Sequence, residues 1–178
     1  MLTGTLFLIL KAVAGFFTAL LLVRTVMRFL RISFVSQIGQ FVLATTNWAV
    51  IPFQRIVPSI GKLDLSALLP AWLIQCLLVL ALTLIGSGGA GDPVSLLVSS
   101  LAFGSLGLLR TALEMLMWAV VLGAILSWVN PYSPLAGPLN AFTRPFLAPF
   151  RRILPPVGGV DLSPLLLLLV LQIILYWL

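Results

Sequence analysis

The chain has 178 residues, of which 61% are hydrophobic and only 8% are charged. Soluble domains usually have about 45–50% apolar and about 25% charged residues, so this composition excludes a water-soluble globular protein and indicates a membrane protein. The formal net charge of +6 comes from ten Lys and Arg residues against four Asp and Glu residues. A basic face exposed to water, which nucleic-acid binding requires, cannot be built from so apolar a chain, so we expect no nucleic-acid partner.

Several kinds of chemistry are excluded by residue types that are missing or scarce. The chain has no His, which excludes Ser-His-Asp hydrolysis and sites that need a His ligand for zinc or haem. The single Cys76 allows neither an internal disulfide nor a CxxC motif. The four acidic residues are Asp64, Asp92, Glu114 and Asp161. We therefore expect no catalytic residue, no metal and no cofactor, and we expect that the chain is not an enzyme.

Stretches with few charges predict the membrane-spanning helices, each of which needs about 20 mostly apolar residues. Four stretches meet this length, at about 5–30, 65–85, 109–130 and 162–178. The first contains Lys11 within its apolar stretch, rather than a basic region before it, so we expect a retained span and not a cleaved signal peptide. Near the end of this span, Arg24 and Arg28 are expected to extend their side chains toward lipid headgroups.

An additional helix is predicted at about 93–109. Asp92 followed by Pro93 is typical of an N-cap and a first helical residue. Joined to the next span, this segment would make a helix of about 57 Å, much longer than the bilayer core of about 30 Å. We therefore expect a separate helix that lies along or leans into the outer leaflet, with a break or bend near Gly104 or Gly107.

The sequence contains an internal repeat with a constant offset of 97 residues. The segment PFQRIVPSIGKLDLS begins at Pro52, and PFRRILPPVGGVDLS begins at Pro149. Without gaps, the match continues to Gln75 and Gln172, and 12 of its 24 positions are identical. Shared composition explains matching leucines but not the matching Arg, Pro, Gly and Asp residues. We therefore predict two tandem repeats.

Each repeat is expected to contain a span, an amphipathic interfacial helix, an Arg- and Pro-containing loop and a second span. In the first repeat, apolar residues between 34 and 42 recur at helical spacing, which favours a helix in the headgroup plane. The predicted divisions are 1–85 for repeat 1, 86–108 for a Gly-rich loop with the additional helix, and 109–178 for repeat 2.

The distribution of basic residues predicts the topology. Both loops within the repeats contain several Arg or Lys residues, whereas the Gly-rich segment 86–92 and the C-terminal end contain none. By the positive-inside rule, both basic loops face the cytoplasm, and both termini lie outside. We expect the chain to be a multi-pass protein of the bacterial inner membrane.

The repeated loop residues are expected to form a rigid elbow that leads into the next span. Proline removes a backbone N–H that would need a partner at membrane depth, and glycine permits a turn with positive φ. The predicted turn residues are Pro58, Gly61, Pro155 and Gly158. Asp64 and Asp161 precede the next apolar stretch, so we expect each to be a helix N-cap. Further prolines at 52, 145 and 149 are assigned to the same loops.

The arginines of the two basic segments have two interpretations. They are candidates for contact with anionic lipid headgroups or with an acidic patch on a partner; the simpler alternative is that they only fix the orientation in the membrane. The candidate residues are Arg55, Arg144, Arg151 and Arg152.

Polar residues within the predicted spans also allow alternatives. Gln75 and Gln172 follow the two loop aspartates by 11 residues, near mid-membrane, which favours hydrogen bonds between helices over a transport role. Glu114 is the only acidic residue within a span and needs a partner. Arg110 precedes it by one helical turn, and Lys11 is a second candidate. A structural ion pair is favoured, with a proton or cation site as the alternative.

The paired segments resemble the repeated signature of the YggT family, or YlmG group, which has relatives in plastids. The resemblance covers essentially the whole chain, including residues 20–24 and 127–131. Copy one departs from the usual pattern at Gln54, where Arg is common, and at Trp48. The resemblance implies a multi-pass membrane protein without assigned enzymatic activity or catalytic residues. It also implies links to osmotic or potassium stress tolerance, cell division and envelope organisation, and in plastids to maturation of a membrane cytochrome.

Two functions are consistent with these observations. The first is a non-enzymatic scaffold or assembly factor that works through helix packing and two cytoplasmic basic loops. The second is a small oligomeric transport component or channel modulator for cation or osmotic homeostasis. The expected partners are the lipid bilayer, with anionic lipids as candidates, and a membrane protein or further copies of the chain.

Overall fold

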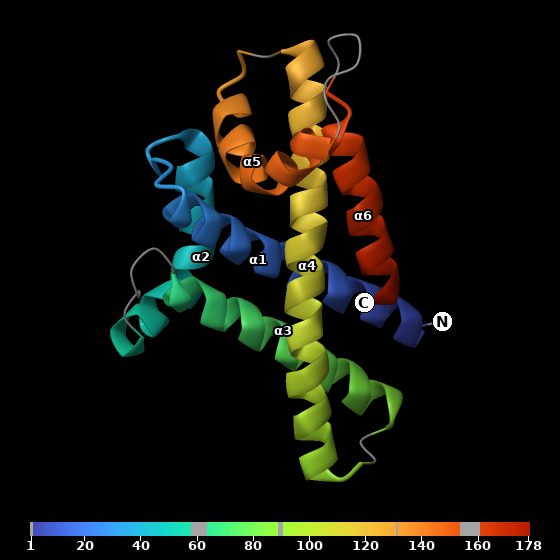
Figure 1. Cartoon of the computed structure of the whole chain (residues 1–178). Coiled ribbons are helices and arrows are strands. Elements are labelled where there is room, and N and C mark those ends of the chain that lie inside the picture. Colours follow the sequence, from blue (N-terminus) through green and yellow to red (C-terminus); the bar gives the residue numbers. More distant parts are fainter. Residues whose placement is uncertain (1, 58–63, 89–90, 131, 154–160) are drawn as a thin grey trace. The chain divides into compact units, whose positions relative to one another are not determined.

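The computed structural model describes residues 2–57, 64–88, 91–130, 132–153 and 161–178, and in these ranges it contains six α-helices and no strands (Figure 1). This confirms the predicted all-α class. The helices are α1 (Leu2–Phe29), α2 (Gln37–Ile56), α3 (Leu65–Gly86), α4 (Pro93–Val129), α5 (Ala136–Ile153) and α6 (Ser163–Trp177).

The chain forms two compact units, Met1–Thr111 and Ala112–Leu178, and α4 runs from the first into the second. Among the described residues, α1, α3 and α4 are long and apolar enough to cross a membrane. The fourth predicted span forms α6, which is apolar but has only 15 residues. At 1.5 Å per residue, α6 is about 22 Å long, shorter than a bilayer core of about 30 Å.

The predicted break before the third span is wrong, because α4 is one continuous helix of 37 residues. It begins as expected, since the carboxylate of Asp92 accepts a hydrogen bond from the backbone N–H of Ser95 at 3.1 Å. Gly104 and Gly107 allow close packing of α4 and do not bend it. A Cβ at Gly104 would lie 2.7 Å from the Cα of Cys76 on α3, and one at Gly107 would lie 2.8 Å from Oε1 of Gln75. Their missing side chains let the two helices approach closely.

The assignment of three prolines to loops is also wrong. Pro52 lies inside α2, and Pro145 and Pro149 lie inside α5. Each proline removes one helical hydrogen bond and frees a carbonyl in the preceding turn. All three are exposed, so at a membrane surface water can hydrate the freed carbonyls. As a consequence, the arginines that follow these prolines lie on the last helical turns rather than in loops.

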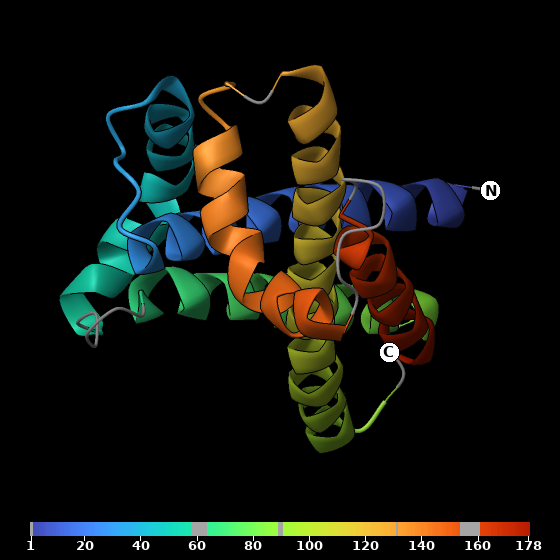
Figure 2. The same cartoon turned by 45° about the horizontal axis from the view of Figure 1, so that its top comes forward.

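The first unit is built around the contact of α1 with α3, which run side by side in two views (Figures 1 and 2), and α2 packs against both. The buried residues at its centre are Leu21, Val50, Ala67 and Ala71. In lipid, helices associate through close packing and hydrogen bonds, because lipid tails are as apolar as leucine. The two alanines bring α3 close to its neighbours, as small residues do at such interfaces.

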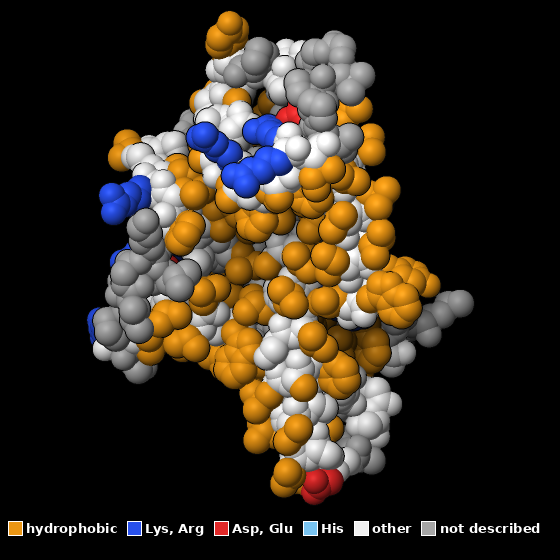
Figure 3. All heavy atoms as spheres, viewed as in Figure 1, with side chains coloured by type: hydrophobic (Ala, Val, Ile, Leu, Met, Phe, Trp, Pro, Cys, Tyr) orange, Lys and Arg blue, Asp and Glu red, His pale blue; other side chains and the backbone are white. Residues whose placement is uncertain are grey.

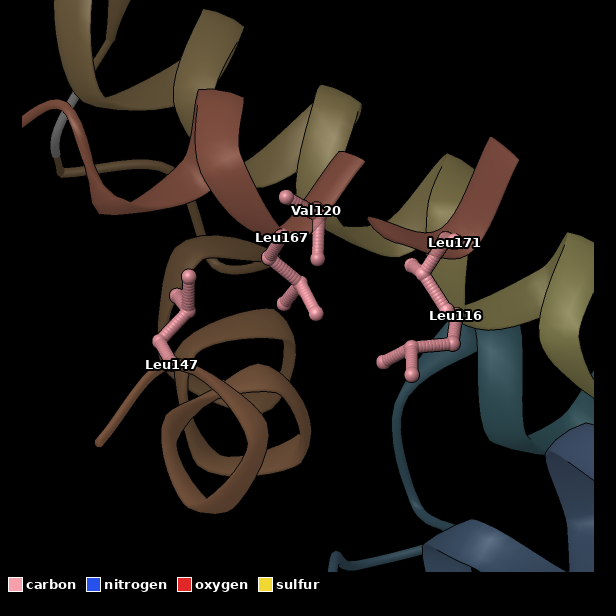
Figure 4. Close-up of a cluster of buried hydrophobic side chains, with 5 residues drawn as sticks. All are labelled: Leu116, Val120, Leu147, Leu167 and Leu171. Atoms are coloured by element: carbon pink, nitrogen blue, oxygen red, sulfur yellow. The ribbon is translucent and has the colours of Figure 1, made fainter. Parts of the chain in front are cut away.

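The second unit contains the C-terminal part of α4 together with α5 and α6. Its buried cluster consists of Leu116, Val120, Leu147, Leu167 and Leu171, which come from all three helices (Figure 4). The side chains of Leu116 and Leu171 lie next to one another in this cluster. The tandem-repeat organisation and its residue boundaries stay a prediction.

Candidate functional site

Arg24 is buried between α1 and α2 instead of extending toward the lipid headgroups, which corrects the prediction for this side chain. It is only 6% exposed. Its Nη1 donates hydrogen bonds to Oγ1 of Thr46 at 2.8 Å and to Oδ1 of Asn47 at 2.9 Å. Burying a guanidinium is costly unless hydrogen bonds replace its hydration. The hydroxyl and the amide of α2 supply these bonds.

Arg28, one helical turn further along α1, forms an ion pair with Asp64. Its Nη1 lies 3.1 Å from Oδ2 of Asp64, and the side chains are 39% and 2% exposed, respectively. The hydroxyl of Ser66 donates a hydrogen bond to Oδ1 of the same carboxylate. Asp64 therefore occupies the N-cap position of α3, but its side chain does not cap the helix. Because a buried carboxylate needs a counter-charge, Asp64 bonds to Arg28 and Ser66 instead.

These contacts join three helices of the first unit, α1, α2 and α3. Arg24 connects α1 to α2, and Arg28 connects α1 to the start of α3. Two arginines face one carboxylate, and Asp64 also interacts electrostatically with Arg24. We call Arg24, Arg28, Thr46, Asn47, Asp64 and Ser66 the polar junction. It holds the start of α3 against α1.

The second unit has a related arrangement that is more exposed. Nε of Arg151 donates to Oδ2 of Asp161 at 2.8 Å, and the two side chains are 47% and 38% exposed. Oδ1 of Asp161 accepts from the backbone N–H of Ser163 at 2.9 Å. Leu162, not Asp161, is the N-cap of α6, so the predicted cap is displaced by one residue. The carboxylate still accepts an N–H of the first helical turn.

The surroundings of Asp161 change its acidity. Partial burial raises the pKa of this carboxyl, but the hydrogen bonds from Ser163 and the ion pair with Arg151 outweigh it, and the pKa lies below its ordinary value. The carboxylate form is therefore favoured, and the Arg151 pair persists at neutral pH.

A hollow of about 230 Å³ lies along one face of α5. It is lined by Asn140, Thr143, Arg144, Leu147 and Arg151. Lys and Arg side chains gather over this helix (Figure 3). Thr143 and Leu147 are buried, whereas Asn140, Arg144 and Arg151 are exposed. The hollow therefore has a floor packed on the core and a rim of polar and basic groups.

The aspartates at the equivalent positions of the repeated motif, Asp64 and Asp161, pair with arginines from non-equivalent positions. Arg151, which pairs with Asp161, corresponds at an offset of 97 residues to Gln54. A glutamine has no positive charge, and Asp64 pairs with Arg28 of α1 instead. Neither the repeat nor the local sequence pattern predicts that Arg24 and Arg28 belong to this junction. The departure at Gln54 was the available signal that Asp64 needed another cation.

The two repeated glutamines have different environments. Nε2 of buried Gln75 donates to Oγ1 of Thr18 on α1 at 3.1 Å and of Thr111 on α4 at 3.3 Å. Gln75 thus connects three helices of the first unit. Gln172 is exposed on α6, and no hydrogen-bond partner for its side chain is found within the described ranges.

The other predicted residues are spread over the structure. Lys11, Arg55, Arg110, Arg144 and Arg152 are exposed, and Glu114 is half-buried. Arg110 and Glu114 lie one turn apart on α4, and neither is without a partner. The predicted turn residues Pro58, Gly61, Pro155 and Gly158 lie outside the described residues. Among the described residues, no group of three or more His, Cys, Asp or Glu side chains is placed to hold a metal ion.

Comparison with known proteins assigns the chain to a family. The family described as CCB3/YggT matches residues 3–85 and 103–178. The YggT protein of Escherichia coli K12 is 32% identical over 172 residues, which cover 96% of this chain and 87% of that protein. A Pseudomonas aeruginosa protein is 35% identical over 93% of this chain and 84% of its own length.

A plant relative matches a shorter segment. The chloroplastic YlmG homolog protein 2 of Arabidopsis thaliana is 41% identical over 54 residues, 30% of this chain and 22% of that protein. No solved structure matches the chain significantly. The family match and the bacterial relatives agree with the resemblance of the repeated motif, and together they show that the chain belongs to the CCB3/YggT family.

Proposed function

We propose that the chain is a non-enzymatic scaffold or assembly factor of the bacterial inner membrane, and that it docks a partner through the basic ends of α2 and α5. We define these basic ends as Arg55 and Arg152, which lie in the last helical turns and are both exposed. The proposed partner is a membrane protein with an acidic patch. In this topology the basic ends face the cytoplasm, and both termini lie outside.

The observation that carries this proposal is that each basic end precedes a helix whose start is held by an ion pair. Arg28 holds Asp64 at the start of α3, and Arg151 holds Asp161 before α6. The helices that carry the basic ends are themselves held, because α2 is bonded to Arg24 of α1 and Arg151 of α5 pairs with Asp161. A preorganised surface loses less conformational entropy when a partner binds, which favours docking as the role of this arrangement.

The alternative of a transport component receives less support from the polar groups in the spans. In the first unit, the Gln75 amide donates to two threonine hydroxyls, which is a packing role rather than a hydrated path. A role in envelope organisation, cell division or osmotic stress tolerance agrees with what the family resemblance implies, and we propose that docking serves such a process.

The proposal is tested by substituting both basic ends. We expect Arg55→Gln with Arg152→Gln to reduce the yield of partner proteins that co-purify from native membranes in mild detergent, measured by quantitative mass spectrometry. Arg144→Gln with Arg31→Gln removes the same charge at exposed positions outside the basic ends and is the matched control. If the wild type, the control and the Arg55→Gln, Arg152→Gln variant all co-purify the same amount of partner proteins, docking through the basic ends is overturned.

A further inference from the structure

The polar rim of the α5 hollow lies on a single face of the helix. Asn140, Arg144 and Arg151 follow the spacing i, i+4 and i+11, which places them within about 40° of one another around the helix axis. Arg152, the immediate neighbour of Arg151, lies about 100° away and does not line the hollow. The hollow is thus distinct from the basic end at Arg152, although both are on α5.

The chemistry of the rim suits a phosphate group. Two guanidinium groups offer planar pairs of N–H donors that match phosphate oxygens, and Asn140 adds an amide donor. Thr143 donates its hydroxyl to the carbonyl of Leu139 at 2.9 Å, so this residue shapes the floor and is not a donor to a ligand. Asp161 contacts Nε of Arg151, which leaves the other side of that guanidinium available to the hollow.

The amphipathic character of α5 indicates that the phosphate belongs to a lipid. On the side of the helix opposite the rim, Phe146 and Ile153 are 43% and 70% exposed. A helix with apolar side chains on one face and basic ones on the other lies at the boundary of headgroups and acyl chains. Its basic face is then at the depth of the lipid phosphates, where it is attracted by anionic headgroups.

We propose that the hollow of α5 binds the phosphate of an anionic glycerophospholipid, with Arg144 and Arg151 as the two phosphate ligands and Asn140 as an additional donor. Asp161 positions Arg151 for this contact through its ion pair. This inference rests on the proposed function, because both require α5 to lie at the membrane surface. It assigns a ligand to the hollow, which is a different surface of α5 from the basic end at Arg152.

The test is a titration of the purified full chain in an uncharged detergent. Isothermal titration calorimetry follows the binding of short-chain phosphatidylglycerol, with short-chain phosphatidylcholine and inorganic phosphate as parallel probes. We expect Arg144→Gln to weaken phosphatidylglycerol binding about tenfold, which corresponds to the ~1.5 kcal/mol of one hydrogen bond to a charged group. Arg144 has no role in the Arg151–Asp161 pair, so this variant leaves that contact in place.

Arg152→Gln is the matched control, because it removes the same charge about two turns further along α5 without touching the rim. We expect its affinity to stay within about twofold of wild type. Asn140→Ala removes a donor without changing the charge and should also weaken binding. Equal weakening by Arg144→Gln and Arg152→Gln would show a non-specific charge effect, and equal binding of phosphatidylcholine would show that anionic lipid is not selected. Either result overturns the site.

The titration with inorganic phosphate distinguishes a lipid headgroup from free phosphate as the ligand of the hollow. Binding of phosphate alone that is as tight as that of phosphatidylglycerol, and equally sensitive to Arg144→Gln, would overturn the lipid assignment in favour of a soluble anion. Failure of this site is distinguishable from failure of docking, because docking depends on Arg55 and Arg152 and is read from co-purified proteins.

Discussion

Nη1 of Arg28 lies 3.1 Å from Oδ2 of Asp64, and this contact joins the end of α1 to the start of α3. The carboxylate is 2% exposed, whereas the related carboxylate of Asp161, paired with Arg151, is 38% exposed. The same motif position is thus a buried structural contact in one unit and a surface contact in the other. The two ion pairs should therefore differ strongly in their contributions to the free energy of unfolding.

Substitution of Arg28 and of Arg151 measures how much each ion pair contributes to the free energy of unfolding. We expect Arg28→Gln to lower the free energy of unfolding by about 2–3 kcal/mol, because it leaves a buried carboxylate without its closest counter-charge. Arg151→Gln should cost no more than about 1 kcal/mol, since its partner is hydrated. Unfolding in mixed micelles, titrated with a denaturing detergent, measures both values. Equal losses in the two variants would contradict the assigned burial of Asp64.

The repeated glutamines provide a second comparison. Gln75→Leu should destabilise the chain by about 0.6–2 kcal/mol, because it removes the hydrogen bonds to Thr18 and Thr111. Gln172→Leu should leave the stability unchanged, since Gln172 is exposed on α6. The same unfolding titration checks the result. If Gln172→Leu were the more damaging substitution, the structural assignment of Gln75 would be wrong.

The close approach of α3 and α4 predicts the effect of adding one methyl group. A Cβ at Gly104 would lie 2.7 Å from the Cα of Cys76, whereas one at Gly123, on the same helix, would have nothing within 4 Å. We expect Gly104→Ala to destabilise the chain by about 1–3 kcal/mol through overpacking. Gly123→Ala should be neutral or stabilising by up to about 1 kcal/mol, because alanine favours the helix. Thermal unfolding of both variants tests this, and a stable Gly104→Ala variant would contradict the contact.

The lowered pKa of Asp161 predicts a stability change in acid. Because this pKa lies below its unfolded value of about 3.9, the stabilisation is present above about pH 4 and is lost as the pH falls through the folded pKa. Its size is at most about 1 kcal/mol, since the pair is exposed. The difference in unfolding free energy between wild type and Asp161→Asn should therefore shrink between about pH 5 and pH 2. A difference that stays constant over this range would exclude the linkage.

Much of the fold could be predicted from the sequence, because the apolar segments and the N-cap at Asp92 are local signals. The extent of the helices was harder to predict. Local proline rules ended two helices too early, whereas exposure allows Pro52, Pro145 and Pro149 to remain helical. Gly104 was interpreted as a break, although its role depends on Cys76, which is 28 residues away in the chain.

The candidate site could be predicted only in part, for the same reason. The two loop aspartates are evident from the repeat, but their partners are not. Arg28 lies 36 residues before Asp64 in the sequence, and only tertiary packing brings the two residues together. The hollow of α5 depends on which face of the helix packs on the core, which a short, proline-containing stretch does not reveal by its periodicity.

Docking of a partner is decided by the mass and composition of the complex that this chain forms in native membranes. The full chain is purified through an affinity tag in mild detergent, and the complex is analysed by mass determination and quantitative mass spectrometry. If the chain is a scaffold, we expect a second membrane protein in near-stoichiometric amount, and we expect it to be lost in the Arg55→Gln, Arg152→Gln variant. A complex made only of copies of this chain, with no partner, would contradict it.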